Sequence, residues 1–275
     1  MSSASLRGSV ELDTRVALRF ALVVDTPMIF MLRPRSSVGQ WVSQESYRIL
    51  PATSVEEFTD PYGNLCQRLV APPGDFLVEA RAQVRVAATI EQAPGAPFIP
   101  VPSLPESTLQ FLLPSRYCPS DRLGDRAQSL VTGLQPGYDQ VAAICGWIHR
   151  NIVYRYGISN ANTSALETLQ QGAGVCRDFA HLAITLCRAL SIPARMVMGF
   201  HPDLPVPDIH AWLEAYVGGR WYPFDPTQAV TRPARVAVGY GRDAADVSIV
   251  TQFGPRADPL LEVEVGRTTG GPAML

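Results

Sequence analysis

Several classes of protein are excluded by what this sequence of 275 residues lacks. The net charge is −2 and no stretch concentrates basic residues, so nucleic-acid binding has no support from composition. The apolar run from Val16 to Leu32 is interrupted by Arg19 and Asp25, which excludes a transmembrane helix there. Residues 1–11 contain no apolar core of a signal peptide. We therefore expect a cytoplasmic protein whose partners include neither nucleic acid nor a membrane.

Metal-binding patterns are also absent. The sequence has no Cys-x-x-Cys, no His-x-x-x-His and no acidic cluster, so we expect no zinc site, no calcium site and no other cofactor. Cys187 follows Cys176 on one expected helix, roughly 16 Å further along its axis, which is too far for a disulfide. Free thiols suit a reducing compartment. The five cysteines are Cys66, Cys118, Cys145, Cys176 and Cys187.

The first part of the chain has the residue pattern that is typical of β-strands. Apolar and polar residues alternate over residues 76–88, which predicts a half-buried strand. A run bounded by turn sequences predicts a second strand over 65–70, and residues 15–32 add one or two more. No helix is expected before Asp121. A chain of this length favours two domains, and we expect the first to be a β-rich domain over residues 1–110.

The following part mixes helices with strands. Seven prolines within residues 94–119 indicate a linker or a segment wrapped over the surface. Apolar residues at helical spacing predict one helix over 139–151 and another from Cys176 to about Leu190, which Pro193 prevents from continuing. A central helix packed on an antiparallel sheet, after a β domain, predicts the α+β fold class.

Strands and a loop follow the second helix. We expect a short strand over 195–200 and then a proline-punctuated loop over 201–208, a candidate for substrate contacts. A last strand is expected over 260–265. The second domain would then span residues 111–250, and residues 251–275 would form a C-terminal strand and tail that pack back on the protein.

Cys176 has a setting suited to nucleophilic catalysis. It follows a glycine-rich turn, in the sequence Gly172-Ala-Gly-Val-Cys-Arg-Asp-Phe-Ala180, and it opens the central helix. Backbone N–H groups at a helix N-terminus favour the thiolate over the thiol. The same groups can hold the oxyanion that forms when the thiolate attacks a carbonyl.

A hairpin is expected to supply the partners of this thiol. Glycines 218–219 separate two strand-like runs, which predicts a two-residue loop and places Trp212 opposite Asp225. Because side chains alternate along a strand, His210 then shares their face and comes within hydrogen-bonding reach of Asp225. A carboxylate bonded to one imidazole nitrogen fixes the tautomer and leaves the other nitrogen aimed at Cys176.

The sequence resembles bacterial transglutaminase-like proteins, a group often described as cysteine proteases. The similarity spans residues from about 121 to 247 and implies a papain-like core. Five segments carry it in one order, namely Thr163–Leu182, Ile192–Arg195, His210–Trp212, Phe224–Thr227 and Gly241–Val247. The resemblance implies that Cys176 is the nucleophile, His210 the general base and acid, and Asp225 the orienting carboxylate. It also implies that residues 111–250 form the catalytic core.

Three further residues are candidates for substrate or oxyanion contact. Asp178 is characteristic of the site in the group it resembles, yet a carboxylate in a first helical turn also favours the helix dipole. Trp212 either walls an acyl pocket or packs in the core. Tyr154 is a candidate because transglutaminases use an upstream aromatic residue. The sequence does not identify the second oxyanion donor.

The other histidines receive no catalytic role. His181 lies about 140° around the helix from Cys176, so it is not the base and is expected to be structural. His201 lies in a loop and has no assigned role.

These residues predict an acyl-transfer enzyme acting on amide bonds of peptides or proteins through a thioester. Resolution of the thioester by water, which we favour, would make it a peptidase, amidase or deamidase. Resolution by an amine would make it a protein-crosslinking transglutaminase. A third alternative is a non-catalytic binding or scaffold protein that keeps the fold. The oligomeric state is not predicted.

Overall fold

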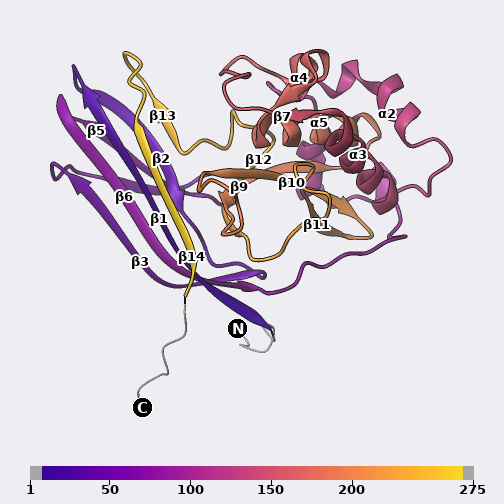
Figure 1. The fold of residues 1–275 in the computed structure, drawn as a ribbon, viewed down its shortest axis with the longest axis horizontal. Coiled ribbons are helices and arrows are strands. Elements are labelled where there is room, and N and C mark those ends of the chain that lie inside the picture. The colour runs from indigo at the N-terminus through magenta and orange to yellow at the C-terminus, as the bar shows by residue number, and fades with distance from the viewer. Residues whose placement is uncertain (1–7, 269–275) are drawn as a thin grey trace.

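The computed structural model describes residues 8–268 and shows long β-strands lying beside a core of helices and strands (Figure 1). The expected α+β class is confirmed. The C-terminal strand and tail were expected over residues 251–275, and residues 269–275 of this segment lie outside the described residues. Within the described residues, no helix combines the length and the apolar character needed to cross a bilayer.

Two four-stranded antiparallel sheets make up the β part of the molecule. Their strand orders are β14-β1-β6-β3 and β13-β2-β5-β4, so strands from the end of the chain complete both sheets. The strands are Ser9–Leu22 (β1), Thr26–Arg33 (β2), Gln40–Leu50 (β3), Glu56–Thr59 (β4), Leu65–Ala71 (β5), Gly74–Ala87 (β6), Val250–Gln252 (β13) and Leu260–Arg267 (β14).

Alternation of apolar side chains explains how these sheets pack. In β1 and β6 every second residue is buried, and Leu12 pairs with Val84 in the antiparallel register. The rings of Phe20 and Phe30, from different sheets, meet edge to face with centroids 6.2 Å apart. The strands expected from alternation are therefore confirmed. Strands β3 and β4 were not expected because most of their side chains are exposed, which leaves no buried stripe to read.

Short helices interrupt the proline-rich segment, where no helix was expected. They are Val101–Ser103 (η1), Glu106–Leu109 (α1), Gln110–Leu112 (η2) and Ser120–Arg122 (η3). Pro100 and Pro105 precede the first two with extended backbone, and one turn of helix is too short to show apolar periodicity. Phe111 packs edge to face on Trp221 at 5.4 Å, so the segment covers one face of the core sheet.

The core contains one antiparallel sheet of order β11-β10-β9-β12 and four longer helices. The helix α5 lies at the centre, buried along its length, and packs on this sheet (Figure 1). The sheet strands are Ala194–Phe200 (β9), His210–Val217 (β10), Arg220–Phe224 (β11) and Val236–Gly241 (β12). The other elements are Gly124–Leu130 (α2), Tyr138–Asn151 (α3), Ala165–Gln171 (α4), Cys176–Ala189 (α5) and the short parallel pair Val153–Tyr154 (β7) and Ala173–Gly174 (β8).

The free edge of β12 is covered by two buried amide side chains from the β part. Gln40 donates to the carbonyl of Ala237 and accepts from its N–H, at 2.8 Å each. Asn64 does the same for Tyr240, at 2.7 and 2.8 Å. Each amide thus presents one donor and one acceptor, as a neighbouring strand would, and satisfies backbone groups that an edge strand leaves unpaired.

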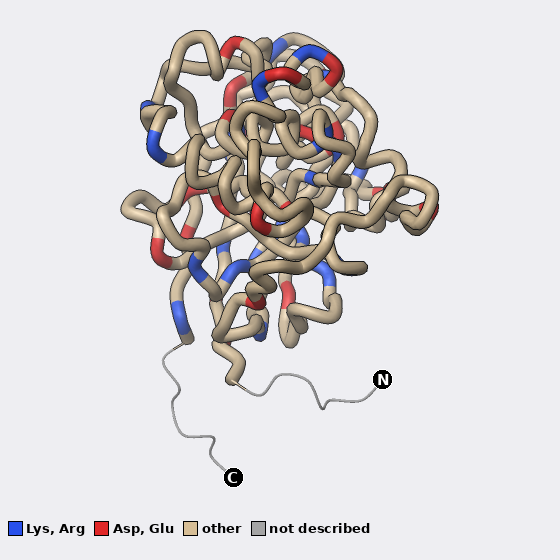
Figure 2. Tube along the Cα trace, turned by 90° about the vertical axis from the view of Figure 1, so that its right-hand side faces the viewer, with Lys and Arg blue, Asp and Glu red and all other residues tan. Residues whose placement is uncertain are grey.

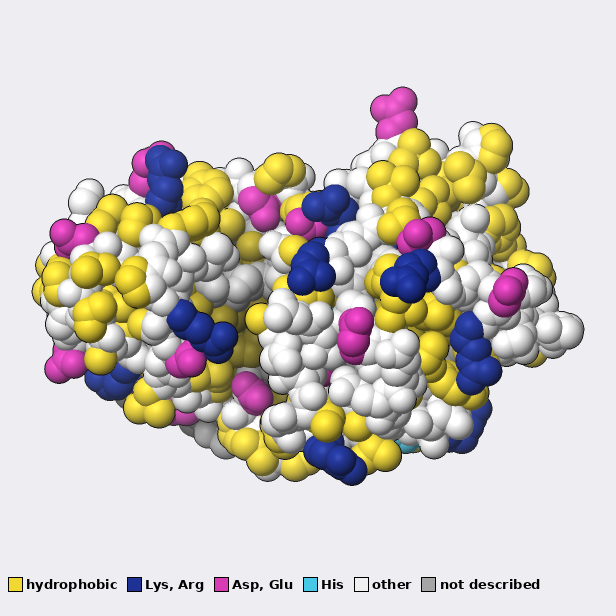
Figure 3. Space-filling view, turned by 90° about the horizontal axis from the view of Figure 1, so that it is seen from above, with side chains coloured by type: hydrophobic (Ala, Val, Ile, Leu, Met, Phe, Trp, Pro, Cys, Tyr) yellow, Lys and Arg dark blue, Asp and Glu magenta, His cyan; other side chains and the backbone are white. Residues whose placement is uncertain are grey.

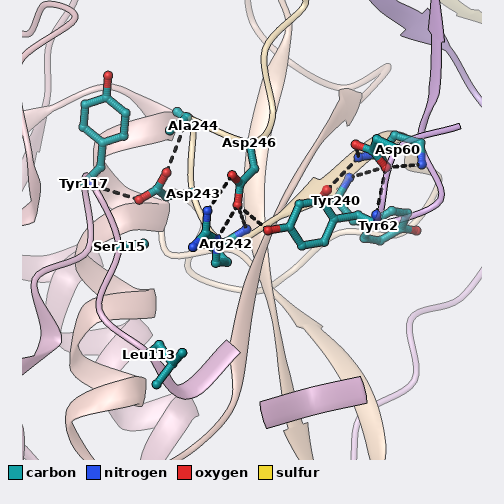
Figure 4. A network of polar contacts seen from close by, with 12 residues as sticks. Asp60, Tyr62, Leu113, Ser115, Tyr117, Tyr240, Arg242, Asp243, Ala244 and Asp246 are labelled. Atoms are coloured by element: carbon teal, nitrogen blue, oxygen red, sulfur yellow. Dashed lines mark hydrogen bonds and ion pairs between the residues drawn. The ribbon is translucent and has the colours of Figure 1, made fainter. Parts of the chain in front are cut away.

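A polar network continues this junction into the core (Figure 4). The Tyr62 hydroxyl donates to Asp246 Oδ2 at 2.7 Å, and Asp246 also pairs with the Arg242 guanidinium. Asp243 accepts the backbone N–H of Tyr117 at 2.7 Å. The segment Gly241–Val247, noted in the sequence, therefore joins the β part to the start of the core.

The surface carries no concentration of one charge in the views shown. Basic and acidic positions are interspersed along the chain (Figure 2). Seen from above, apolar and charged side chains also alternate, and the surface is hollowed where the β sheets meet the core (Figure 3).

Candidate active site

Cys176 is the first residue of α5, and it is the one cysteine of the five that is partly exposed. Its Sγ lies 3.8 Å from the carbonyl oxygen of Ile209, the residue before β10. The helix begins here because Val175 is extended and its N–H is accepted by Asp178 Oδ2 at 2.9 Å. A Cβ at Gly174 would lie 2.7 Å from the Cβ of Asp178, so this fold-back requires glycine.

Asp178 is fully buried, and its contacts are those of a helix cap. Its second oxygen, Oδ1, accepts from Arg177 Nε and Nη2 at 3.3 and 3.2 Å. The sequence left both a role in the site and a role as a helix cap open for Asp178, and its contacts in the structure are those of a helix cap. Asp178 holds the turn on which the thiol is presented.

His210 and Asp225 come together on the hairpin that the sequence predicted. Val217 pairs with Arg220 around the two-glycine loop, which confirms the expected register. His210 Nε2 lies 2.7 Å from Asp225 Oδ2, and both residues are buried. Because Nε2 is bound to the carboxylate, Nδ1 is the nitrogen that remains for the thiol of Cys176.

The electrostatics of this pair favour charge on both partners. Burial alone would lower the pKa of His210, but hydrogen bonds to Asp225 and Cys176 outweigh it and raise the pKa to about 9. Burial likewise raises the pKa of Asp225, yet His210, Arg235 and Thr227 bring it down to about 2. The arrangement is an imidazole held beside a thiol by an ionised carboxylate.

The loop after Asp225 supplies two partners that sequence reasoning missed. Thr227 donates to Asp225 Oδ1 from its N–H at 3.0 Å and from its hydroxyl at 2.6 Å. Arg235 donates from Nη2 to Asp225 Oδ2 at 3.0 Å. Thr227 belongs to the segment Phe224–Thr227 and could have been found there. Arg235 lies outside every recognised segment and carried no signal.

His201 is the other residue without an assigned role that reaches the site. Its ring meets that of His210 edge to face, with centroids 6.2 Å apart. Its Nδ1 accepts the N–H of Asp203 at 3.0 Å, so the proton of the neutral ring is on Nε2. Burial, with Arg235 and His210, lowers the pKa of His201 to about 4. His201 is thus neutral beside a charged His210.

Two aromatic candidates flank the site differently. Trp212 is only 2 % exposed and stacks on His210 with centroids 6.0 Å apart, so it backs the imidazole. Tyr154 is 41 % exposed and lies beside the backbone and thiol of Cys176, while its ring packs on Tyr156 and Phe179. Burial and the neighbouring Cys176 raise the pKa of Tyr154, so its hydroxyl keeps its proton.

His181 has a structural position, as expected. It is fully buried on α5, stacks on Tyr117, and its Nε2 accepts the N–H of Ala244 at 3.1 Å. It ties the central helix to the segment 241–247.

Comparison with known proteins identifies two families whose models match this chain. Residues 124–226 match the family model of the transglutaminase-like superfamily, and residues 21–85 match that of the bacterial transglutaminase-like N-terminal region. An uncharacterised protein of Mycobacterium leprae is 30% identical over 231 residues, which cover 79% of this chain and 82% of that protein. An uncharacterised protein of Mycobacterium tuberculosis is 36% identical over 115 residues, 36% of this chain and 37% of the relative.

One solved structure is similar over nearly the whole chain. It is a candidate cysteine protease from Cytophaga hutchinsonii, with a TM-score of 0.88 and 35% identity, covering 97% of this chain and 93% of that one. The chain therefore belongs to the transglutaminase-like superfamily, and the resemblance found in the sequence is confirmed. Membership and this neighbour support an enzyme of the cysteine-dependent kind.

Proposed function

We propose that this protein is an acyl-transfer enzyme that cleaves amide bonds of peptides or proteins through a thioester on Cys176. The observation that carries the proposal is the 2.7 Å contact of His210 Nε2 with Asp225, which leaves Nδ1 for the thiol at the N-terminus of α5. Cys176 would be the nucleophile, His210 the general acid and base, and Asp225 the orienting carboxylate.

The proposed acylation begins with the Cys176 thiolate and the His210 imidazolium. The thiolate attacks the amide carbon, a C–S bond forms, and the carbonyl oxygen takes the negative charge. The backbone N–H of Cys176 and the protonated hydroxyl of Tyr154 are the donors we assign to this oxyanion. His210 then gives its Nδ1 proton to the departing nitrogen as the C–N bond breaks.

Deacylation needs the opposite protonation state of His210. The neutral imidazole takes a proton from an incoming water, which attacks the thioester and releases a carboxylic acid and the thiol. Hydrolysis is favoured because Cys176 is partly exposed and water reaches the thioester. Peptidase, amidase and deamidase activities share these steps, and the amide substrate distinguishes them.

Transamidation is the alternative outcome of the same intermediate. All 23 basic residues of the chain are arginine, so the protein contributes no lysine amine as an acceptor. An acceptor amine would therefore come from another molecule, and self-crosslinking through lysine is excluded. We also propose a cytoplasmic location, which the five free cysteines support.

The first experiment measures the rate of iodoacetamide labelling of Cys176 against pH, with peptide mapping to separate it from the four buried cysteines. We expect rapid labelling that persists well below pH 8, because His210 stabilises the thiolate, and its loss in His210→Ala. An ordinary thiol profile that the substitution leaves unchanged would contradict the proposal and favour a non-catalytic scaffold.

Products then separate hydrolysis from transamidation. Peptide amides and glutamine peptides are incubated with and without a small primary amine, and acid-quenched protein is analysed by mass spectrometry for an acyl group on Cys176. Free acid with the amine present supports a hydrolase, whereas amine incorporation supports a transglutaminase. The Cys176→Ala variant is the control and is expected to yield neither product.

A further inference from the structure

Arg235 places a second cation on the carboxylate that orients His210. Its Nη2 donates at 3.0 Å to Asp225 Oδ2, the same oxygen that His210 Nε2 contacts at 2.7 Å. The Arg235 side chain is only 6% exposed, and that of Asp225 is fully buried. Burying a guanidinium costs free energy unless the group is paired, so the burial of Arg235 against Asp225 requires an explanation.

A second buried arginine shows what a purely structural role looks like in this chain. Arg188 donates from Nε, Nη1 and Nη2 to the carbonyls of Ala194, Leu113 and Arg242 and to Ser115 Oγ, at 2.7 to 3.0 Å. Arg235 differs, because its Nε and Nη1 have no hydrogen-bond acceptor among residues 8–268. Its close hydrogen-bond partner among the described residues is Asp225, and its contact with Gln228 is 3.5 Å long.

The local backbone holds Arg235 in this position. Ala234, the preceding residue, has a φ of 61°, a left-handed conformation that costs a non-glycine residue about 1 kcal/mol or more. The guanidinium lies over the ring of Trp212 at 5.1 Å, and the same ring stacks on His210. Strain of this kind persists only where surrounding contacts enforce it. Here those contacts include the ring of Trp212, which also stacks on His210.

The charged and titratable groups around the pair come from several elements. Arg235 is the nearest additional cation to Asp225, and neutral His201 faces His210. The remaining groups are Cys176 of α5, Cys145 of α3, Glu214 of β10, and Asp203 and Asp208 of the loop before β10. In the described part of the chain none of them forms a hydrogen bond or ion pair with Asp225 Oδ2, so Arg235 is the fixed charge that acts on it directly.

A fixed cation at this oxygen has a defined effect on the proposed cycle. When His210 has given its proton away, Asp225 would otherwise remain a buried carboxylate with only a neutral imidazole beside it, and it would draw a proton back. The permanent positive charge of Arg235, held beside Asp225, stabilises the ionised carboxylate while His210 is neutral. It also disfavours the imidazolium, so His210 becomes neutral at lower pH than it would without the cation.

We propose that Arg235 is a positioning residue that keeps Asp225 ionised and allows His210 to return to its neutral form in the acyl-enzyme. This inference rests on the proposed function, and it assigns Arg235 mainly to deacylation, the step that needs neutral His210. Acylation, which uses the imidazolium, would depend on it less.

The test follows the pH dependence of deacylation in Arg235→Gln and Arg235→Lys. In the glutamine variant, we expect the pKa that governs deacylation to rise by about one unit, which slows the step roughly tenfold near pH 7. Raising the pH above the shifted pKa should restore the rate. The lysine variant keeps the cation and should stay close to wild type. A pH-independent loss, or an unshifted profile, would overturn the inference.

A titration without turnover separates this inference from the proposed function. The His210 imidazole is titrated by NMR in the Cys176→Ala background, with and without Arg235→Gln. A higher pKa in the double variant supports the role of Arg235 even if no substrate is turned over, and an equal pKa contradicts it.

Folding is controlled in the same experiment. Circular dichroism is recorded for each variant, and Arg15→Gln breaks an arginine–carboxylate cluster in the β part without touching the site. Should Arg235→Gln fail to fold, Arg235→Lys decides, since a rise of a full unit with the cation retained would overturn the inference.

Discussion

At the scale of single residues, the site is defined by which atom of each side chain is already engaged. His210 is hydrogen-bonded through Nε2, and Asp225 accepts hydrogen bonds with both of its oxygens. Cys176 is fixed at the N-terminus of a buried helix. The freedom that remains is confined to the thiol and to Nδ1. These are the two groups that the proposed attack and proton transfer to a leaving nitrogen require.

The raised pKa of His210 makes stability depend on pH. Its pKa is about 9 in the folded protein and near 6.5 when unfolded, so its contribution is complete below pH 6.5 and is lost as the pH rises through 9. We expect the difference in unfolding free energy between wild type and His210→Gln to fall by on the order of 3 kcal/mol across that window. Urea titrations from pH 5 to 9.5 measure it.

The control for this prediction is His149→Gln, at an exposed position on α3. Asp225 does not contribute to the change between pH 6.5 and 9. Its pKa is about 2, so the stability that it contributes is lost only below about pH 4. A difference between wild type and His210→Gln that stayed constant from pH 6 to 9 would show that folding does not raise the pKa of His210.

At the scale of elements, the pairing of β9 with β12 positions Arg235 for Asp225. Gly199 lies at this pairing, where it faces Ala237 on one side and His210 on the other. A Cβ there would lie 1.8 Å from the carbonyl oxygen of Val236. Backbone cannot give way as a flexible side chain can, so β12 would have to move.

We therefore expect Gly199→Ala to destabilise the protein by about 3 kcal/mol or more and to lower turnover, because the residue after Arg235 is displaced. Gly266→Ala is the matched control, since it lies in β14 with no atom within 4 Å of the added Cβ. Its effect on stability should stay within about 0.5 kcal/mol. Equal effects of the two substitutions on the urea midpoint would refute the packing argument.

The elements also show where sequence reasoning succeeds. The hairpin could be predicted because two glycines fix the loop, and the loop fixes which of His210, Trp212 and Asp225 share a face. Helix α5 was predicted from its apolar spacing. Strand β12 was not, since nearly all of its residues are buried and show no alternation, and its edge contacts come from Gln40 and Asn64, far away in sequence. Contacts of that kind leave no periodic signal.

Arg235 illustrates the same limit within the site. Nothing in its immediate sequence distinguishes it from the exposed arginines of the chain. Its role depends on the φ of Ala234 and on the loop that returns from Asp225, and both are properties of the folded chain.

At the scale of the whole molecule, the β part and the core are joined through buried polar contacts as well as apolar ones. Asn64 is fully buried and satisfies both backbone groups of Tyr240. Met198 and Phe200 of β9 pack in the same apolar cluster as Met28 and Phe30 of β2. Such continuity predicts that the two parts unfold together.

Thiol labelling in increasing urea tests this coupling, because Cys66 reports on the β part and Cys145 on the core. In wild type we expect one midpoint for both. Asn64→Leu leaves the N–H and C=O of Tyr240 unpaired at a cost of about 2–4 kcal/mol, so the midpoints should fall and separate. The exposed Asn162→Leu is the control, and separate midpoints already in wild type would contradict the coupling.

The burial of the other four cysteines also determines the redox chemistry of Cys176. An oxidant would convert Cys176 to a sulfenic acid, which a second cysteine nearby can rescue by forming a disulfide. The next cysteine on the same helix, Cys187, is fully buried and roughly 16 Å further along, and burial raises its pKa to about 12. Burial raises the pKa of Cys66, Cys118 and Cys145 as well, so among the described residues no other cysteine offers a thiolate that could form a disulfide with Cys176. Recovery from oxidation depends on small thiols from the surroundings, and where those are scarce the damage proceeds to the irreversible sulfinic acid.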